Sequence, residues 1–133
     1  MTLPTPRVTP YLLYDDLEGA LAWLARAFGL RERMRLAGPD GKPRHAELSF
    51  GESGVILVGW PGPQYRNPKR LGSVTQSLYV HVDDVDSLFR QAVEAGALVL
   101  ESPADQPYGE RRCGVEDPEG HRWYFAQVLS PVR

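Results

Sequence analysis

The pair His45 and Glu47 could do acid–base chemistry, because one residue separates an imidazole from a carboxylate. If the range 44–50 is a strand, both side chains lie on the same face, about 7 Å apart along the strand. Such a pair could act as a general acid and base or supply half of an unusual metal site. The alternative is an ordinary solvated or cross-strand hydrogen-bonded pair on a sheet surface. The sequence leaves these interpretations open.

A second group of candidates comes from alternation within two other expected strands. In the range 76–82, the alternating apolar residues suit a helix-covered face, which places Ser77, Tyr79 and His81 on the opposite face. The first expected strand does the same with Thr9 and Tyr11. Aromatic rings with a few hydrogen-bonding groups are typical of a small-molecule pocket. His81 could instead pair with a neighbouring carboxylate.

Other candidates lie in loops and in the last two strands. Tyr108, on the expected loop 102–109, could act as a lid, and Arg112 could contact an anion or simply lie on the surface. Trp60 could cap the binding cleft or fill the seam between two modules. His121 follows a tight turn, and we expect a structural role for it. The complete set of expected ligand-binding residues is Thr9, Tyr11, Trp60, Ser77, Tyr79, His81, Tyr108, Arg112 and Tyr124.

The elements that position these residues occur twice in the chain. Asp15-Asp16 opens an amphipathic helix that ends at Gly29, and Asp83-Asp84 opens another that ends at Gly96. Each helix follows one strand and precedes three, so the sequence predicts an α+β fold of two βαβββ modules. The expected strands are 8–14, 31–36, 44–50, 55–58, 76–82, 98–101, 111–116 and 121–128. Module one covers residues 1–60, a Pro/Gly-rich linker 61–72, and module two 73–133, within a single domain.

Composition excludes several classes of function. A chain of 133 residues with 42% hydrophobic content can bury one core, which the two modules must share. The net charge of -2 gives no basic surface for nucleic acid. No apolar stretch approaches the roughly 20 residues of a membrane-spanning helix, and the start of the chain lacks a signal-peptide core, so we expect a cytoplasmic protein. The single cysteine, Cys113, permits no internal disulfide and is expected to be an ordinary strand residue.

Several short motifs, together with the repeat, carry a resemblance to a known family. They are Pro10-Tyr11-Leu12, Asp40-Gly41-Lys42, His45-Ala46-Glu47-Leu48, Tyr108-Gly109-Glu110-Arg111 and Asp117-Pro118-Glu119-Gly120-His121-Arg122-Trp123. In this order and spacing, the chain resembles the glyoxalase/bleomycin-resistance/dioxygenase group, or vicinal oxygen chelate superfamily, and within it an uncharacterised glyoxalase-like branch. The resemblance implies two modules whose sheets face a shared cleft.

The resemblance also implies where a metal would bind in metal-dependent members. These use a His or Gln from the first strand of each module and a Glu from the last strand of each. The matching positions here are Thr9, Ser77, Tyr124 and either Leu57 or Val58, none of which is a good transition-metal ligand. We therefore expect no metal at this place and no other cofactor.

Two functions are consistent with these observations. The first is metal-free binding or sequestration of a small aromatic or drug-like molecule, as in the bleomycin-resistance members that the chain resembles. The alternative is a lyase, isomerase or dioxygenase that uses a displaced metal site or acid–base chemistry at His45 and Glu47. We also expect a homodimer, since Tyr11 on an exposed first strand and Trp23, off the apolar stripe of its helix, indicate a surface that needs cover.

Overall fold

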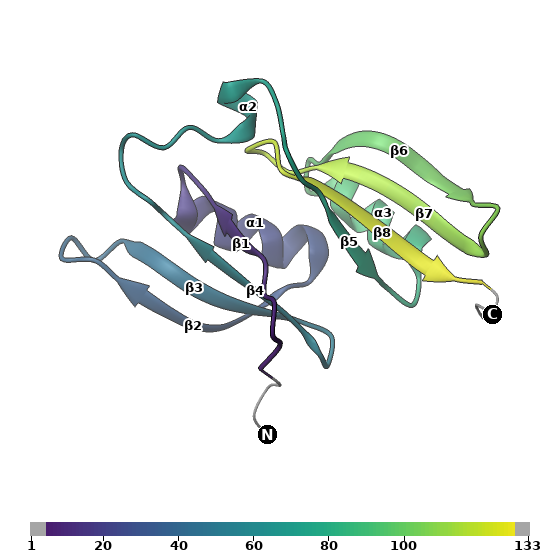
Figure 1. Ribbon diagram of the computed structural model, residues 1–133, viewed down its shortest axis with the longest axis horizontal. Helices are drawn as coiled ribbons and strands as arrows, with labels where there is room; N and C mark the ends of the chain where they lie inside the picture. Colours follow the sequence, from purple (N-terminus) through teal and green to yellow (C-terminus); the bar gives the residue numbers. More distant parts are fainter. Residues whose placement is uncertain (1–4, 130–133) are drawn as a thin grey trace. The chain divides into compact units, whose positions relative to one another are not determined.

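The computed structural model describes residues 5–129, and within them the predicted duplication is confirmed. The chain divides after Asn67 into two compact units, each with one four-stranded mixed sheet and one long helix (Figure 1). Unit 1 consists of β1 (Tyr11–Leu13), α1 (Leu17–Phe28), β2 (Arg31–Ala37), β3 (Pro43–Phe50) and β4 (Gly54–Gly59). Unit 2 consists of α2 (Pro68–Leu71), β5 (Leu78–His81), α3 (Val85–Glu94), β6 (Leu98–Asp105), β7 (Glu110–Glu116) and β8 (Arg122–Val128).

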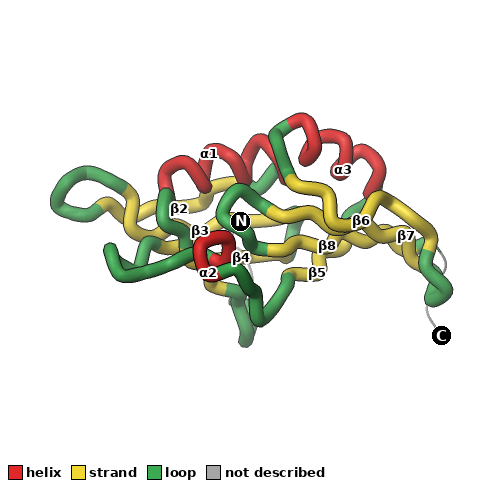
Figure 2. Tube along the Cα trace, turned by 90° about the horizontal axis from the view of Figure 1, so that it is seen from above, coloured by secondary structure: helices red, strands yellow, loops and turns green. Residues whose placement is uncertain are grey.

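The two sheets have the same strand order and the same pairing. Unit 1 reads β1-β4-β3-β2 and unit 2 reads β5-β8-β7-β6. The first strand of each unit runs parallel to the last, with Tyr11 opposite Leu57 and Tyr79 opposite Tyr124, and the remaining pairs are antiparallel. In each unit the long helix lies on one face of its own sheet (Figure 2). The other face is left for the side chains that alternate outward.

The start and end of α1 follow the capping signals in the sequence. The Asp16 carboxylate accepts a hydrogen bond from the Gly19 amide at 3.0 Å, and Gly29 ends the helix in the left-handed conformation with φ of 73°. Trp23 corrects an expectation, because its side chain is buried in unit 1 with its ring 5.1 Å from that of Phe28. It therefore belongs to the core. The core of unit 1 comprises Leu12, Tyr14, Leu17, Leu21, Trp23, Leu24, Ala27, Phe28, Leu30, Ala46, Leu48, Ile56 and Val58.

The core of unit 2 lies between α3 and its sheet. Trp123 is 1% exposed, stacks on Phe125, and donates its indole N–H to Asp117 at 3.1 Å. Alternation in β8 thus places Trp123 toward the helix and Tyr124 away from it. Cys113 is buried in β7, and burial raises the pKa of its thiol to about 11, as suits an unreactive strand residue. The apolar core residues are Val85, Ala92, Cys113, Val115, Trp123 and Phe125, whereas Ala126 is buried on the other face, opposite Arg112.

The strands predicted at 8–14 and 76–82 are shorter in the structure, at Tyr11–Leu13 and Leu78–His81, and two larger differences concern β6 and α2. β6 continues to Asp105, through Pro103, although the sequence predicts a strand end at Glu101 and a loop from there to Gly109. As the edge strand of its sheet, β6 has one neighbour only, so a proline without an N–H is tolerated, and register shifts occur on both sides of Glu101.

The other difference is α2, a short helix in a range predicted to lack regular structure. It packs against the turn before β8, where the Lys69 amide donates to the Glu119 carbonyl at 3.0 Å. Gly120 permits this approach: its φ is 95°, and a Cβ there would lie 2.6 Å from the Lys69 nitrogen. The end of the Pro/Gly-rich linker is thereby attached to unit 2. No helix within residues 5–129 has both the length and the apolarity that crossing a membrane requires.

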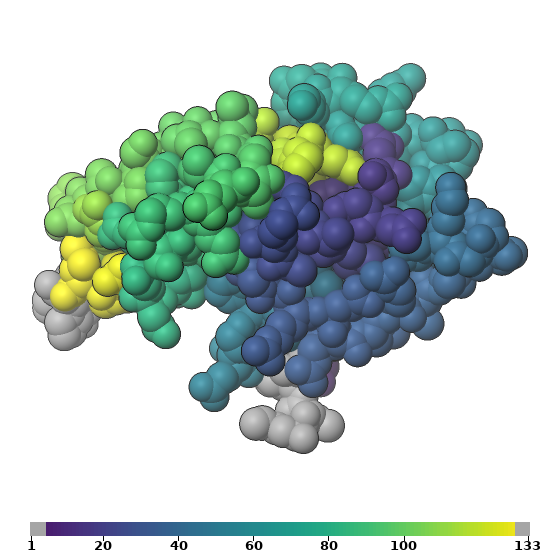
Figure 3. Space-filling model, turned by 180° about the vertical axis from the view of Figure 1, so that it is seen from behind, coloured from purple at the N-terminus to yellow at the C-terminus, as the bar shows by residue number. Residues whose placement is uncertain are grey.

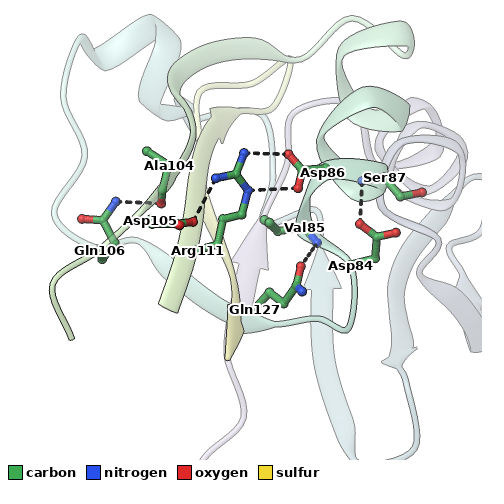
Figure 4. Close-up of polar contacts among 9 residues, drawn as sticks. All are labelled: Asp84, Val85, Asp86, Ser87, Ala104, Asp105, Gln106, Arg111 and Gln127. Carbon is green, nitrogen blue, oxygen red and sulfur yellow. Dashed lines mark hydrogen bonds and ion pairs between the residues drawn. The ribbon is translucent and has the colours of Figure 1, made fainter. Parts of the chain in front are cut away.

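One arginine ties α3 to the sheet edge in unit 2. The Arg111 guanidinium donates to both carboxylate oxygens of Asp86 at 2.9 and 3.1 Å, and to Asp105 at 2.9 Å (Figure 4). Nearby, the Val85 amide at the start of α3 donates to the side chain of Gln127 in β8 at 3.0 Å. The ion pairs of Arg111 raise the pKa of its guanidinium, and the pairing with Arg111 lowers the pKa of the Asp86 carboxyl group.

We expect Arg111→Met to lower the free energy of unfolding, because two carboxylates lose a shared bidentate partner. Urea denaturation at low and high salt should show the decrease, with a smaller effect at high salt. The matched control is Arg33→Met, which removes an exposed arginine of β2. Equal effects of the two substitutions would contradict the role assigned to Arg111.

Candidate functional site

The face of the unit 2 sheet that points away from α3 carries a group of polar and aromatic side chains. Alternation explains the grouping, because the neighbours of these residues along β7 and β8 are buried against the helix or bonded to it. We call this group the unit 2 polar face; it consists of Tyr79, His81, Glu101, Glu110, Arg112 and Tyr124.

Glu110 joins two residues of β5 on this face. Its carboxylate accepts a hydrogen bond from the Tyr79 hydroxyl at 2.5 Å and contacts His81 Nε2 at 3.0 Å. These two bonds, the Tyr79 bond first, lower the pKa of Glu110, so the group is a carboxylate. Desolvation of the hydroxyl and its bond to Glu110 raise the pKa of Tyr79, although its ring is half-exposed. Tyr79 therefore remains a donor.

Arg112 organises the rest of the polar face. Its guanidinium makes a bidentate ion pair with Glu101, with N–O distances of 3.0 to 3.1 Å. Its central carbon lies 5.3 Å from the ring centroid of Tyr124, and one nitrogen is 3.4 Å from the Tyr108 hydroxyl. Beneath Tyr124 lies Gly114, where a Cβ would come within 2.6 Å of the ring. The tyrosine ring is thus held between a glycine backbone and an arginine.

Unit 1 has a related face with different chemistry. The Tyr11 hydroxyl lies 2.8 Å from His45 Nδ1, and the two rings meet edge to face. A Cβ at Gly59 would come within 2.8 Å of the Tyr11 hydroxyl oxygen, so this tyrosine also lies over a glycine. Glu47 shares the face of β3 with His45, but within residues 5–129 no hydrogen bond joins the two side chains. The partner of His45 is a tyrosine.

The remaining expected residues lie outside these two clusters. Thr9 is half-buried just before β1, and Ser77 is exposed just before β5. Trp60 follows β4, with the Arg44 guanidinium carbon 4.3 Å from its ring centroid, and lines a cavity of about 310 Å³ together with Asp40. Asp40 pairs with Arg44 at 2.8 Å. Whether Trp60 contacts a ligand stays a prediction.

The positions that the superfamily uses for a metal do not fit one in this chain. A hydroxyl at Thr9 and Ser77, an alkyl group at Leu57 or Val58 and a phenol at Tyr124 provide neither imidazole nor carboxylate. Across residues 5–129 the structure contains no group of three or more His, Cys, Asp or Glu side chains that could hold a metal ion elsewhere. We therefore derive no chemistry through a metal at this place.

Sequence reasoning missed Glu101 and Glu110. Glu110 immediately precedes the expected strand 111–116, and Glu101 ends another, so neither was placed on a face. The signal was present, since the alternation of Cys113 and Val115 with Arg112 and Gly114 extends back by one residue pair to Glu110. Extending the strand to its observed start places this carboxylate on the same face as Arg112.

A pH dependence follows from the lowered pKa of Glu110. Because its carboxylate is stabilised in the folded state, the unfolded chain binds a proton at higher pH, and stability is lost as the pH falls below 4.5 through the lowered value. In Glu110→Gln this contribution is absent, so the stability difference from wild type should be largest near neutral pH and shrink in acid. Urea denaturation across the range checks this. A difference that is constant with pH would contradict it.

Comparisons with known proteins agree with this architecture. A family model described as Glyoxalase/Bleomycin resistance protein/Dioxygenase superfamily matches residues 7–125. Uncharacterized proteins of Mycobacterium bovis and Mycobacterium tuberculosis are 36% identical over 131 residues, covering 96% of this chain and 86% and 77% of theirs. The crystal structure of TioX from Micromonospora sp. ML1 is 34% identical, with a TM-score of 0.76, and the match covers 94% of this chain and 100% of TioX.

A more distant structure shows the same fold. The fosfomycin resistance protein FosX from Listeria monocytogenes is 13% identical, with a TM-score of 0.67 and 94% of each chain covered. The repeated unit, the strand order and the family match over most of the chain lead to one assignment. The chain belongs to the glyoxalase/bleomycin resistance protein/dioxygenase superfamily.

Proposed function

We propose that this protein binds a small planar aromatic molecule without the help of a metal. The observation that carries the proposal is the pair of tyrosines on the unit 2 polar face, the exposed Tyr79 and the partly buried Tyr124, each fixed by polar neighbours. Aromatic rings beside a few oriented polar groups are the usual composition of a small-molecule site. Tyr11 on the corresponding face of unit 1 extends the same chemistry.

The tyrosines are held before any ligand arrives. Tyr79 is anchored through its hydroxyl to Glu110, and Tyr124 rests over Gly114 beside Arg112. A ring that is already oriented loses little conformational entropy when a planar molecule stacks on it. Since Arg112 is neutralised by Glu101, stacking and hydrogen bonding supply more of the recognition than a free positive charge.

The geometry of His45 and Glu47 in unit 1 gives little support to the alternative that the protein is an enzyme using these two residues as acid and base. His45 Nδ1 is engaged by the Tyr11 hydroxyl, and Glu47 makes no hydrogen bond to His45 within the described residues. A carboxylate that orients a histidine is a common requirement of general base catalysis. We therefore assign His45 and Tyr11 to ligand contact.

We further propose that the working unit is a homodimer. β1 is an edge strand of its sheet, and it is preceded by Val8, whose side chain is 84% exposed, and contains Tyr11, which is 48% exposed. An edge with exposed apolar groups favours association. Trp23, which the sequence suggested as a second exposed apolar group, does not support a dimer because its side chain lies in the core.

Binding can be tested with a panel of planar aromatic compounds in ligand-observed saturation-transfer NMR, followed by calorimetry with the tightest binder. Tyr124→Ala and Tyr79→Ala should each weaken binding by roughly 1 to 3 kcal/mol, because a stacked ring is lost. Dialysis against a chelator should leave the affinity unchanged.

The matched control is Trp123→Phe, on the opposite side of the same strand. It should lower the free energy of unfolding by roughly 1 to 3 kcal/mol, since the indole bond to Asp117 is lost in a buried site, and leave affinity nearly unchanged. A panel without any binder, or tyrosine variants that bind as wild type does, would contradict the proposed function.

The dimer can be tested by sedimentation velocity at micromolar concentration and above. We expect a dimer for wild type, and a shift toward monomer for Val8→Lys, because a charge at the β1 edge disfavours association. Leu98→Lys, at the β6 edge of unit 2, is the matched control, since Leu98 is 59% exposed. A wild-type monomer throughout would remove the proposal.

A further inference from the structure

We propose that His81 is a general base that accepts a proton from a carbon acid bound at the unit 2 polar face. The inference rests on the proposed function, because the substrate is a planar molecule bound at the same face. It adds a class of reaction to binding: metal-independent proton abstraction, as in an elimination or an isomerisation.

The hydrogen bond from His81 to Glu110 determines which ring nitrogen of the imidazole carries the proton. Glu110 is a carboxylate and can only accept, so the bond of 3.0 Å to His81 Nε2 requires a proton on Nε2. A neutral His81 then carries its basic lone pair on Nδ1, for which the described residues provide no hydrogen-bond donor. The Tyr79 hydroxyl, on the other oxygen, keeps the carboxylate in place. A carboxylate and a histidine in this relation form an oriented base.

The position of His81 allows a small molecule to reach it. It is the last residue of β5, its side chain is 57% exposed, and it lines a cavity of about 270 Å³. The other lining residues are Val82, Asp83, Gln127 and Val128, at the carboxyl ends of the parallel strands β5 and β8. The Tyr79 ring, with its centroid 5.5 Å from that of His81, provides an aromatic surface beside it.

The duplication gives an internal comparison. Aligned by their strand registers, Tyr79 corresponds to Tyr11, whereas His81 corresponds to Leu13 and Glu110 to Pro43. Unit 1 thus keeps the tyrosine and lacks both members of the histidine–carboxylate pair. The pair is a feature of unit 2, added to a tyrosine that both units share.

The reaction step needs no oxidant or reductant. The C–H bond of the substrate breaks, its proton moves to His81 Nδ1, and its electron pair forms a new π bond while a leaving group departs or a neighbouring carbonyl becomes an enolate. The imidazolium formed is stabilised by the negative charge of Glu110. The other titratable groups beside His81 are Tyr79 and Asp83, and Arg112 on β7 acts on Glu110.

A suitable probe is 5-nitrobenzisoxazole, a planar compound that a base opens by removing the ring C–H proton as the N–O bond breaks. The coloured product, 2-cyano-4-nitrophenolate, is followed by absorbance. We expect wild type to accelerate opening, and His81→Ala to reduce the protein-dependent rate about 10-fold or more. Glu110→Gln should also lower this rate, since an amide cannot stabilise the imidazolium.

His121→Gln is the control, because it removes another imidazole from outside the polar face and should leave the rate unchanged. Saturation transfer to the probe and circular dichroism of each variant separate binding and folding from catalysis. Probe that binds equally to wild type and to folded His81→Ala, with the rate lost only in the variant, supports the proposal. Equal rates with binding intact overturn His81 as the base and leave the proposed function standing. A wild-type protein that neither binds nor opens the probe overturns the proposal for His81, whereas the proposed function falls only if the whole panel of planar compounds also fails to bind.

Discussion

Each four-stranded sheet of this protein has one long helix to cover it, and this constraint decides which side chains form the core and which are available for function. A sheet buried on one face must alternate apolar and polar residues along every strand. In β8 the rule gives Trp123 to the core, at 1% exposed, and leaves its neighbour Tyr124 on the opposite face. The space-filling view from behind shows the surface of each unit, coloured from purple to teal for unit 1 and from teal to yellow for unit 2 (Figure 3).

The polar faces can hold tyrosine, histidine and charged side chains because they point away from the helix-covered core. On both faces a tyrosine ring lies over a glycine of a neighbouring strand: Tyr11 over Gly59, and Tyr124 over Gly114. Any larger residue at either glycine would push the ring away from the sheet, because its Cβ would lie within 2.8 Å of the ring or its hydroxyl. Glycine weakens a strand, and its presence here is explained by the approach of an aromatic side chain.

The fold was predictable from sequence because its signals are local and repeated. The Asp16 and Asp84 caps, the apolar stripes of two helices and the turn glycines each specify an element without reference to distant residues. The errors arise where tertiary context decides. Pro103 can lie within a strand because β6 is the edge strand of its sheet. The helix α2 can pack at its observed place because Gly120 has no Cβ to block the Lys69 backbone.

The site was less predictable than the fold. The sequence placed His45 with Glu47 from spacing alone, yet the nearest functional group to His45 is the Tyr11 hydroxyl from another strand. In the same way, Glu110 and His81 are 29 positions apart, and only the β5-β8-β7 order brings them together. Spacing within one strand reveals which residues share a face. It does not reveal which partners a neighbouring strand supplies.

The two units of the duplication share one scaffold, while the polar side chains on the face away from the helix differ between them. The helix, the strand order and the tyrosine of the first strand are common to both units, and packing of the core requires the first two. Positions on the face away from the helix are not part of the core beneath that helix, and they differ between the two units. Thus Glu110 stands where the register of unit 1 has Pro43, and Arg112 where it has His45. A chain without the metal ligands of its superfamily can still place an imidazole and a phenol within hydrogen-bonding distance of one carboxylate, and in this protein unit 2 does so.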